Sequence, residues 1–328
     1  MDLAAVFAEP LVDLGAETAA FEGIYTPRSF HGASKVGVTA QFLEHAEQYH
    51  RSYFDTGYWS FLLGNALAAA GNPQAPERII DIGSGSGNSV IPLAERFPDA
   101  EILATDISPQ LLAILRDYLR RRSGGDRRFG LVCVDAMAAC YRPGVADLAV
   151  GAAILHHLLE PDRALASCFH ALAPGGWAIF FEPFEAGNAL LKFTYRRILA
   201  AASGAERATP GLRFIERMTE DYKRREQPAS DPLYRELDDK WMFTRTYFER
   251  IRSTQGWSEL ITYGLNISAT GLRDQASVHL RLGAGLSAAA LPDWAWSIID
   301  ETDAGISDDL RKELGQEGAV LLRKPGRA

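Results

Sequence analysis

The stretch IIDIGSGSGN, residues 79–88, carries the residues best suited to binding a ligand. Its three glycines, Gly83, Gly85 and Gly87, stand two apart directly after a short apolar run. Glycine is needed where a backbone turns sharply or where a ligand comes close to it. In a dinucleotide-binding loop the third glycine falls three residues after the second, and here that position is Asn88. The spacing therefore predicts a ligand-binding loop and disfavours NAD as the ligand.

A carboxylate stands at a corresponding place one apolar run further along. Asp106 ends the run 101–106 and follows Gly87 by 19 residues. An acid at the end of a second strand accepts hydrogen bonds from both hydroxyls of a ribose, whichever nucleoside cofactor is bound. The plainer alternative is an aspartate that merely precedes the helix cap Ser108. The glycine loop, the acid and their order together favour a nucleoside cofactor.

Strand and helix signals alternate around these residues. Apolar runs predict strands at 78–83, 101–106, 129–135, 146–152 and 177–184. Helical spacing of apolar residues predicts helices at 90–97, after the Ser108-Pro109 start, and at 158–172. This alternation, with strands so apolar, implies a parallel sheet covered by helices on both faces.

Two regions interrupt the alternation. The pattern of residues 1–75 is mainly helical, and residues 185–240 are predicted to form two helices. Strand signals return at 259–266 and 318–325. We therefore expect an N-terminal helical cap over 1–75, an α/β core over 76–184, a helical insert that covers the acceptor over 185–240, and the remainder of the core over 241–328.

Composition narrows the class of protein. The 328 residues carry a net charge of −8, which argues against a dedicated nucleic-acid partner. No apolar run reaches the roughly 20 residues that span a bilayer, and the acidic start lacks the features of a signal peptide. The three cysteines have no metal-ligand spacing, so we expect reduced thiols, no metal and a cytoplasmic location.

The ordered motifs DIGSGSGN, ATDIS, CVDAM, ADLAVGAAILHHLLEP and LAPGGWAIFFEPF cover about residues 76–184. Together they resemble the class I S-adenosylmethionine (SAM)-dependent methyltransferases. The resemblance implies a Rossmann-like, doubly wound, seven-stranded sheet that is mostly parallel with an antiparallel last strand. It also implies SAM as the cofactor and S-adenosylhomocysteine (SAH) as its product.

The resemblance further implies roles by position within the cofactor site. Asp81 would anchor the loop or contact the methionyl amine through water, and Asp106 would hold the ribose. The other implied cofactor contacts are Gly83, Ser84, Gly85 and Gly87 near the methionine, Ile107 on the adenine, Asp135 and Ala136 at the adenine edge, and Gly151 and Ala152 on the methionyl side.

The acceptor side follows the fourth and fifth predicted strands. Methyl transfer is an in-line displacement, and an oxygen acceptor usually needs a base. His156 and His157 follow the fourth strand, and a histidine has a pKa suited to that task. Glu182, at the end of the fifth strand, is a second candidate base or acceptor ligand. The alternatives are a structural histidine, since LHH is frequent in this superfamily, and a carboxylate that caps the sheet edge.

Aromatic residues of the N-terminal segment form a candidate substrate surface. Tyr49, Tyr53 and Tyr58 could close over the sulfonium, because aromatic faces stabilise cations by about 0.5–2 kcal/mol. The alternative is the packing face of a cap helix, and the residues do not decide between the two.

The sequence thus favours an enzyme that transfers a methyl group from SAM to a small molecule, most simply to oxygen, with nitrogen or carbon also open. Gly151, Ala152 and Ala153 replace the aspartate that metal-dependent catechol enzymes place after the fourth strand. The main alternative is a SAM-binding regulatory or partner protein without transferase activity, and an NAD-dependent oxidoreductase is less favoured. A homodimer is compatible with the sequence.

Overall fold

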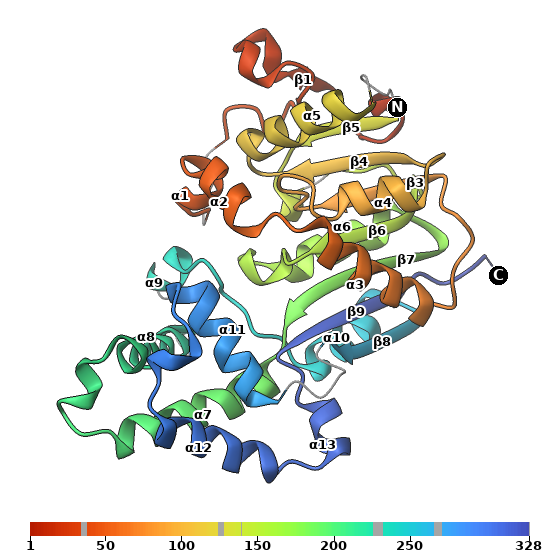
Figure 1. Cartoon of the computed structure of the whole chain (residues 1–328). Helices are drawn as coiled ribbons and strands as arrows, with labels where there is room; N and C mark the ends of the chain where they lie inside the picture. The colour runs from red at the N-terminus through yellow and green to blue at the C-terminus, as the bar shows by residue number, and fades with distance from the viewer. Residues whose placement is uncertain (34–37, 124–127, 139, 226–231, 266–270, 328) are drawn as a thin grey trace.

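The computed structural model describes residues 1–33, 38–123, 128–138, 140–225, 232–265 and 271–327 (Figure 1). Within these residues one sheet of nine strands runs through the molecule. Its order is β1 (Leu11–Asp13), β2 (Tyr25–Pro27), β5 (Phe129–Cys133), β4 (Glu101–Asp106), β3 (Arg78–Ile82), β6 (Ala146–Ala152), β7 (Leu172–Pro183), β9 (Glu317–Arg323) and β8 (Glu259–Gly264).

Seven of these strands, from β5 to β8 in the sheet order, form the Rossmann-like core that the sequence predicts. Strands β5, β4, β3, β6 and β7 run parallel, whereas β9 lies antiparallel between β7 and β8. The five central strands were all predicted, and β7 begins five residues earlier than expected. The sixth predicted strand, 259–266, is observed as β8 and ends at Gly264, and Asn266 lies outside the described residues.

Strands β1 and β2 have no counterpart in the prediction for the N-terminal segment. They form an antiparallel pair, and Tyr25 of β2 pairs with Val132 of β5, which extends the sheet by two strands. The hydroxyl of Thr26 donates to the carbonyl of Cys133 at 2.8 Å and fastens the extension. Each strand has three residues, too few to show an alternating pattern, so periodicity could not reveal them.

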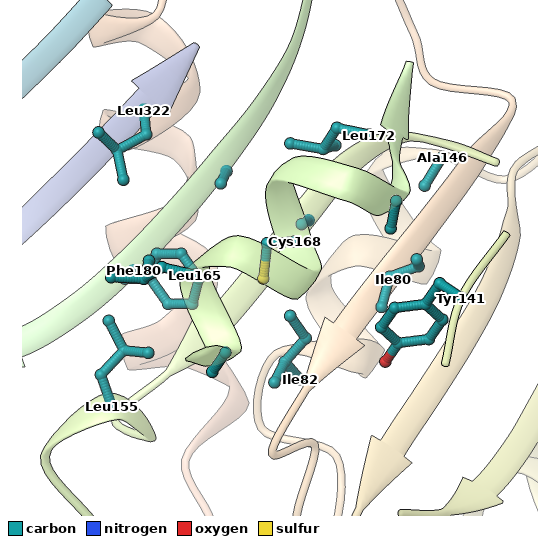
Figure 2. Close-up of a cluster of buried hydrophobic side chains, with 14 of the residues drawn as sticks. Ile80, Ile82, Tyr141, Ala146, Leu155, Leu165, Cys168, Leu172, Phe180 and Leu322 are labelled. Carbon is teal, nitrogen blue, oxygen red and sulfur yellow. The ribbon is translucent and has the colours of Figure 1, made fainter. Parts of the chain in front are cut away.

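Helices cover both faces of the sheet. Helices α3 (Thr56–Ala69), α4 (Val90–Arg96) and α5 (Pro109–Ser123) lie on one face, and α6 (Pro161–Ala171) and α10 (Arg245–Gln255) on the other. Figure 2 shows α6 placing Leu165 and Cys168 against Ile80 and Phe180 of the sheet. The strands are buried on both sides, which explains their continuous apolar character.

Short helices and a helical layer stand at the carboxyl ends of the strands (Figure 1). On one side lie α1 (Ala40–Leu43) and α2 (Ala46–Tyr53). On the other lie α7 (Glu185–Ala201), α8 (Pro210–Arg225), α9 (Pro232–Glu236), α11 (Leu272–Ala284), α12 (Asp293–Ala304) and α13 (Asp308–Glu313). No helix among the described residues combines the length and the apolar character needed to cross a membrane.

The helical layer, which we define as α7, α8, α11 and α12, has its own hydrophobic cluster. Leu191 and Tyr195 of α7 pack with Leu212 of α8, Leu280 of α11 and Trp296 of α12. The sequence predicts a helical stretch between the last two strands, including residues 293–301, but assigns it to the core and only 185–240 to the covering insert. The structure places α11 and α12, from between β8 and β9, in the layer, which is therefore assembled from two separate stretches of chain.

Candidate active site

The glycine loop connects β3 to α4 with a left-handed backbone. Gly83, Gly85 and Gly87 have φ angles of +67°, +53° and +109°, a region that other residues rarely adopt. A methyl group on Gly83 would come within 2.6 Å of the Ile154 side chain, and one on Gly87 within 2.6 Å of Leu115. The loop therefore packs so closely against the turn after β6 and against α5 that only glycine fits at positions 83 and 87.

The Asp106 carboxylate fixes the loop to the end of β4. One oxygen accepts a hydrogen bond from the Gly85 amide at 2.8 Å, and the other accepts one from the Ser108 amide at 2.8 Å. Ser108 in turn accepts a bond from the Leu111 amide and caps α5. The sequence allows two interpretations of Asp106, a ribose-binding acid and an aspartate that precedes a helix cap. The position of Asp106 is compatible with both, because its carboxylate lies at the pocket and directly precedes α5.

Asp81 is a buried carboxylate under the same loop. It is fully buried, and neither of its oxygens has a hydrogen-bond partner among the described residues. Burial raises the pKa of Asp81 to about 7. Because a buried polar group without a partner costs free energy, such a carboxylate points to a hydrogen-bond donor or cation supplied by water or by a ligand.

A pocket opens where β3, β4, β5 and β6 end. Of the predicted cofactor residues, those that line it are Gly83, Gly85, Asp106, Ile107, Asp135, Ala136 and Ala152. Asp81, Ser84, Gly87 and Gly151 lie near it without being part of its lining. Asp135 accepts a hydrogen bond from the Met137 amide at 2.8 Å, and burial raises its pKa.

The N-terminal segment covers this pocket. Tyr49 and Phe42 are part of the lining and contact each other edge to face, with ring centroids 5.0 Å apart. Tyr53 packs against Tyr49, whereas Tyr58 packs against Trp59. Tyr53 and Tyr58 are each about half exposed, at 48%. Of the three predicted tyrosines, therefore, Tyr49 is the one that lines the pocket.

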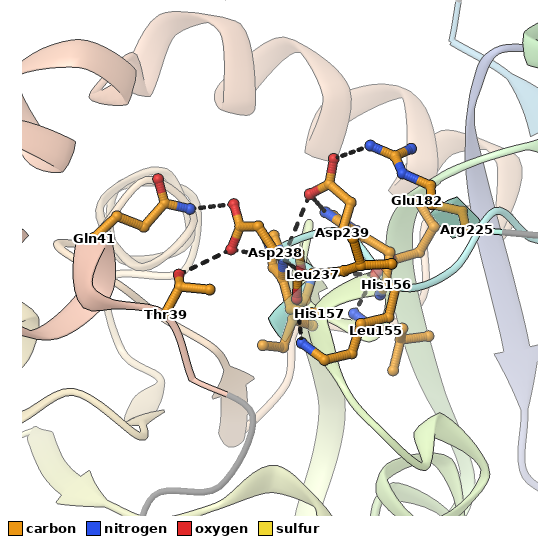
Figure 3. A network of polar contacts seen from close by, with 12 residues as sticks. Thr39, Gln41, Leu155, His156, His157, Glu182, Arg225, Leu237, Asp238 and Asp239 are labelled. Atoms are coloured by element: carbon orange, nitrogen blue, oxygen red, sulfur yellow. Dashed lines mark hydrogen bonds and ion pairs between the residues drawn. The ribbon is translucent and has the colours of Figure 1, made fainter. Parts of the chain in front are cut away.

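Glu182 organises the turn that follows β6. Its carboxylate is fully buried and accepts hydrogen bonds from the amides of Ile154, Leu155 and His156 at 2.8–3.1 Å. It also accepts a bond from Nδ1 of His156 at 2.7 Å (Figure 3). Because β6 and β7 are neighbours, a glutamate at the end of β7 reaches the turn after β6 directly.

The two histidines lie in different electrostatic environments. Burial lowers the pKa of His156, but the hydrogen bond to Glu182 and the charges of Glu182 and Asp239 outweigh burial and raise it to about 9. Burial and the charge of His156 lower the pKa of His157 to about 4. His157 also lines the pocket, and its Nδ1 lies 3.0 Å from the Asp238 carbonyl. At neutral pH, His156 is charged and His157 is neutral.

The segment 238–240, between α9 and α10, completes the site and was missed in the sequence. The Asp238 carboxylate accepts hydrogen bonds from Thr39, at 3.1 Å, and from Gln41 (Figure 3). Asp239 forms an ion pair with Arg225 at 2.7 Å. The Lys240 amide donates to the His156 carbonyl at 2.7 Å. The only signal in the sequence is the cluster Asp-Asp-Lys between helices, which has no distinctive spacing.

A second, larger cavity of about 940 Å³ lies between the ends of β7, β8 and β9 and the helices α11 and α13. Tyr263 and Gln316 line it, and the Tyr263 hydroxyl and the Gln316 side-chain oxygen have no hydrogen-bond partner among the described residues. None of the predicted site residues lines this cavity, so it is separate from the pocket at the glycine loop.

Comparison with known proteins agrees with this geometry. A family model described as a methyltransferase domain matches residues 80–178. A demethylmenaquinone methyltransferase of Thermus thermophilus is 31% identical over 40% of this chain and 60% of its own length. A trans-aconitate 2-methyltransferase of Methylobacterium radiotolerans is 38% identical over 42% of this chain and 49% of its own.

A solved structure extends the likeness of fold over more of the chain. A putative sarcosine dimethylglycine methyltransferase from Galdieria sulphuraria covers 87% of this chain and all of its own, with a TM-score of 0.50 and 12% identity. The chain spans between about a third and 60% of the length of the first curated relatives that it matches. The matched region contains the glycine loop, Asp106, Asp135 and the two histidines. Residues 80–178 therefore form a methyltransferase domain, in agreement with the resemblance to the class I SAM-dependent methyltransferases.

Proposed function

We propose that this chain transfers a methyl group from SAM to a small-molecule acceptor, most simply to a hydroxyl oxygen. The observation that carries the proposal is the pocket itself. It combines the glycine loop, the Asp106 carboxylate and the Asp135 carboxylate on one side with the neutral imidazole of His157 on the other. This arrangement supports a site at which a nucleoside would be recognised beside a group able to act on an acceptor.

The residues present fit the cofactor. Asp106 would hold the ribose hydroxyls, because a carboxylate with two oxygens retains acceptor capacity beside its two backbone partners. Ile107 and Ala136 would contact the adenine, and Asp135 would accept from its amino group. Asp81 offers a buried negative charge to an ammonium, directly or through water. When bound, SAM supplies the methyl group as part of a sulfonium.

The acceptor would meet the cofactor at the turn after β6. A hydroxyl must lose its proton during transfer, and we assign its activation to the histidine pair, in which the neutral His157 would accept the proton because His156 already carries one at neutral pH. Glu182 would position His156, and Tyr49 would help to exclude water from the pocket. We assign the helices of residues 185–240 the role of covering the acceptor. Nitrogen and carbon acceptors remain within the proposal, because alignment alone would suffice for some of them.

Calorimetric titration with SAM, SAH and NAD tests the cofactor. We expect one equivalent of SAM and of SAH to bind and NAD to give no binding heat. Asp106→Ala should weaken SAH binding at least about tenfold, because a hydrogen bond to a charged group contributes about 1.5–3 kcal/mol. Asp300→Ala, which removes an exposed ion pair on α12, is the control and should bind normally. Binding of NAD without SAM would refute the proposal.

Transferase activity needs its own measurement, because a SAM-binding regulator would give the same titration. Transfer of a tritiated methyl group from SAM into a small-molecule extract should be detectable with the unmodified chain. His156→Ala and His157→Ala should each reduce it. Tight SAH binding with no labelled product from any extract would favour the regulatory alternative, and full activity of both variants would contradict the role of the histidines.

A further inference from the structure

Three side chains of the kinds that bind metals meet beside the cofactor pocket (Figure 3). His156 and His157 come from the turn after β6, and Asp239 comes from the segment before α10, far away in the chain. One ligand atom from each lies within 4.8 Å of the other two. From the sequence we expect no metal, and no spacing pattern joins these three residues. The fold creates the cluster.

The two separations that join Asp239 to the histidines are close to those around a single metal ion. Oδ1 of Asp239 lies 3.5 Å from Nε2 of His156 and 3.6 Å from Nδ1 of His157. Two atoms bound to one zinc ion at about 2.1 Å in a tetrahedral arrangement are about 3.4 Å apart. Small side-chain shifts would therefore bring the three groups around one ion, provided that the His157 proton moves from Nδ1 to Nε2 and the contact of Nδ1 with the Asp238 carbonyl is given up.

Neighbouring side chains orient two of the three groups as they would in a metal site. Glu182 holds Nδ1 of His156 at 2.7 Å, which leaves Nε2 directed at Asp239. Arg225 holds Oδ2 of Asp239 at 2.7 Å, which leaves Oδ1 directed at the histidines. Such outer partners fix the orientation of ligands and are a regular part of metal sites. The Asp239 side chain is 38% exposed, so an ion could enter from solvent.

The charge around the cluster favours a cation. The charged side chains that interact with the three residues are the carboxylates of Glu182, Asp238, Glu317 and Asp239 itself and the cations of Arg225 and Lys240. A metal ion would displace the proton of His156, and with both imidazoles then neutral the carboxylates around the cluster outnumber the cations, which favours a divalent ion.

We propose that His156, His157 and Asp239 bind a divalent first-row transition-metal ion, which coordinates the oxygen of the methyl acceptor. Two imidazoles and one carboxylate suit zinc, iron or manganese, and three protein ligands leave positions open for an acceptor. The ion would lower the pKa of the acceptor hydroxyl, whose proton passes to solvent while the electron pair stays on oxygen. This inference rests on the proposed function and specifies how the histidine pair would activate the acceptor.

Metal titration of the full chain tests the site. The protein is stripped with a chelator, dialysed and titrated calorimetrically with zinc chloride and, separately, manganese chloride. We expect one equivalent to bind, and Asp239→Asn to weaken binding at least tenfold. The matched control is Asp300→Asn, because Asp300 is also about half exposed and paired with an arginine, Arg273, but lies on α12 and is not part of the cluster. It should bind metal within about threefold of the unmodified chain.

Three results would overturn the inference: no stoichiometric binding of either metal, equal binding by Asp239→Asn, or equal losses in both variants. A second readout is independent of turnover. Bound manganese should broaden the ring proton signals of His156 and His157 in the NMR spectrum far more strongly than those of His170, which lies near the other end of α6. Broadening that spares His156 and His157 would likewise contradict the site.

The test separates this inference from the proposed function. SAH is titrated into the same metal-free protein. If SAH binds and the metals do not, the metal site is wrong and the proposed cofactor stands. If one metal equivalent binds and SAH does not, the proposed function fails although the metal cluster is real.

Discussion

Glu182 and His156, at the ends of two neighbouring parallel strands, are joined side chain to side chain at 2.7 Å in the interior. The same carboxylate accepts three amides of the turn that carries His156. One residue therefore shapes the turn and sets the charge of the imidazole. Changes at Glu182 should affect stability and the site together.

Glu182→Gln should destabilise the protein. Glutamine has one acceptor oxygen instead of two and brings an NH2 group next to buried amide donors, so we expect a loss of about 2–4 kcal/mol. Urea denaturation monitored by circular dichroism measures it. Glu95→Gln, which alters an exposed ion pair with Arg122, is the control and should change stability by less than about 1 kcal/mol. Equal stabilities of the two variants would contradict the structural role of Glu182.

The pH dependence of stability should report the charge of His156. Its pKa is raised from 6.5 to about 9 in the folded protein. A raised pKa means that the folded state binds the proton more tightly, so this stabilisation is complete below about pH 6.5 and is lost as the pH rises through about 9. The free energy of unfolding should fall across that interval by on the order of 2 kcal/mol. His156→Gln should lose most of this pH dependence. An unchanged profile in the variant would show that another group causes it.

Asp81→Asn should stabilise the protein while weakening cofactor binding. The pKa of the buried carboxyl is raised from 3.8 to about 7, so its ionisation costs stability increasingly between those values and fully above them. At pH 8 the neutral asparagine should raise the free energy of unfolding by on the order of 2 kcal/mol. SAH affinity should fall at least about tenfold, because the charge offered to the ammonium is gone. A variant that is less stable at pH 8 and binds SAH normally would contradict both parts.

Gly83→Ala should lower the stability of the protein more than Gly175→Ala, although both glycines have a left-handed backbone. Gly83 has a φ angle of +67°, and an added methyl group would meet three atoms of Ile154 at 2.6–2.9 Å. Gly175 has a φ angle of +84° with no atom within 4 Å of an added methyl group. We expect Gly175→Ala to cost about 1 kcal/mol from backbone strain alone, and Gly83→Ala to cost about 2–4 kcal/mol. Thermal denaturation of both variants makes the comparison, and equal shifts would show that the contact with Ile154 is unimportant.

Local signals in the sequence predicted the core of the fold well. The runs ending at Asp106 and Ala152 are apolar because their strands are buried on both faces, and Ser108 caps α5 as its position before Pro109 suggests. The glycine loop could also be predicted, because its left-handed backbone requires glycine at each of its three positions separately. Such features depend on neighbours in the chain and leave a pattern there.

Features that depend on distant parts of the chain left no such pattern. Asp239 reaches the histidines only because the segment before α10 crosses the turn after β6. Strands β1 and β2 exist because the edge of β5 offers pairing to Tyr25, and not because of their own three residues. The place of α11 and α12 in the helical layer was hidden likewise, since their apolar faces gave no indication of the partner against which they pack.

The two-part origin of the helical layer has a consequence during synthesis on the ribosome. The strands up to β7 and the helices α3 to α6 precede the helical layer in the chain, whereas Trp296 and Ile299 of α12 follow α7, α8 and α11. Until then, part of the apolar face of α7 has no partner, although the glycine loop can already be in place. A nascent chain of this protein should therefore be able to bind its cofactor before the helical layer has closed, with Leu191 and Tyr195 open to chaperones in the interval.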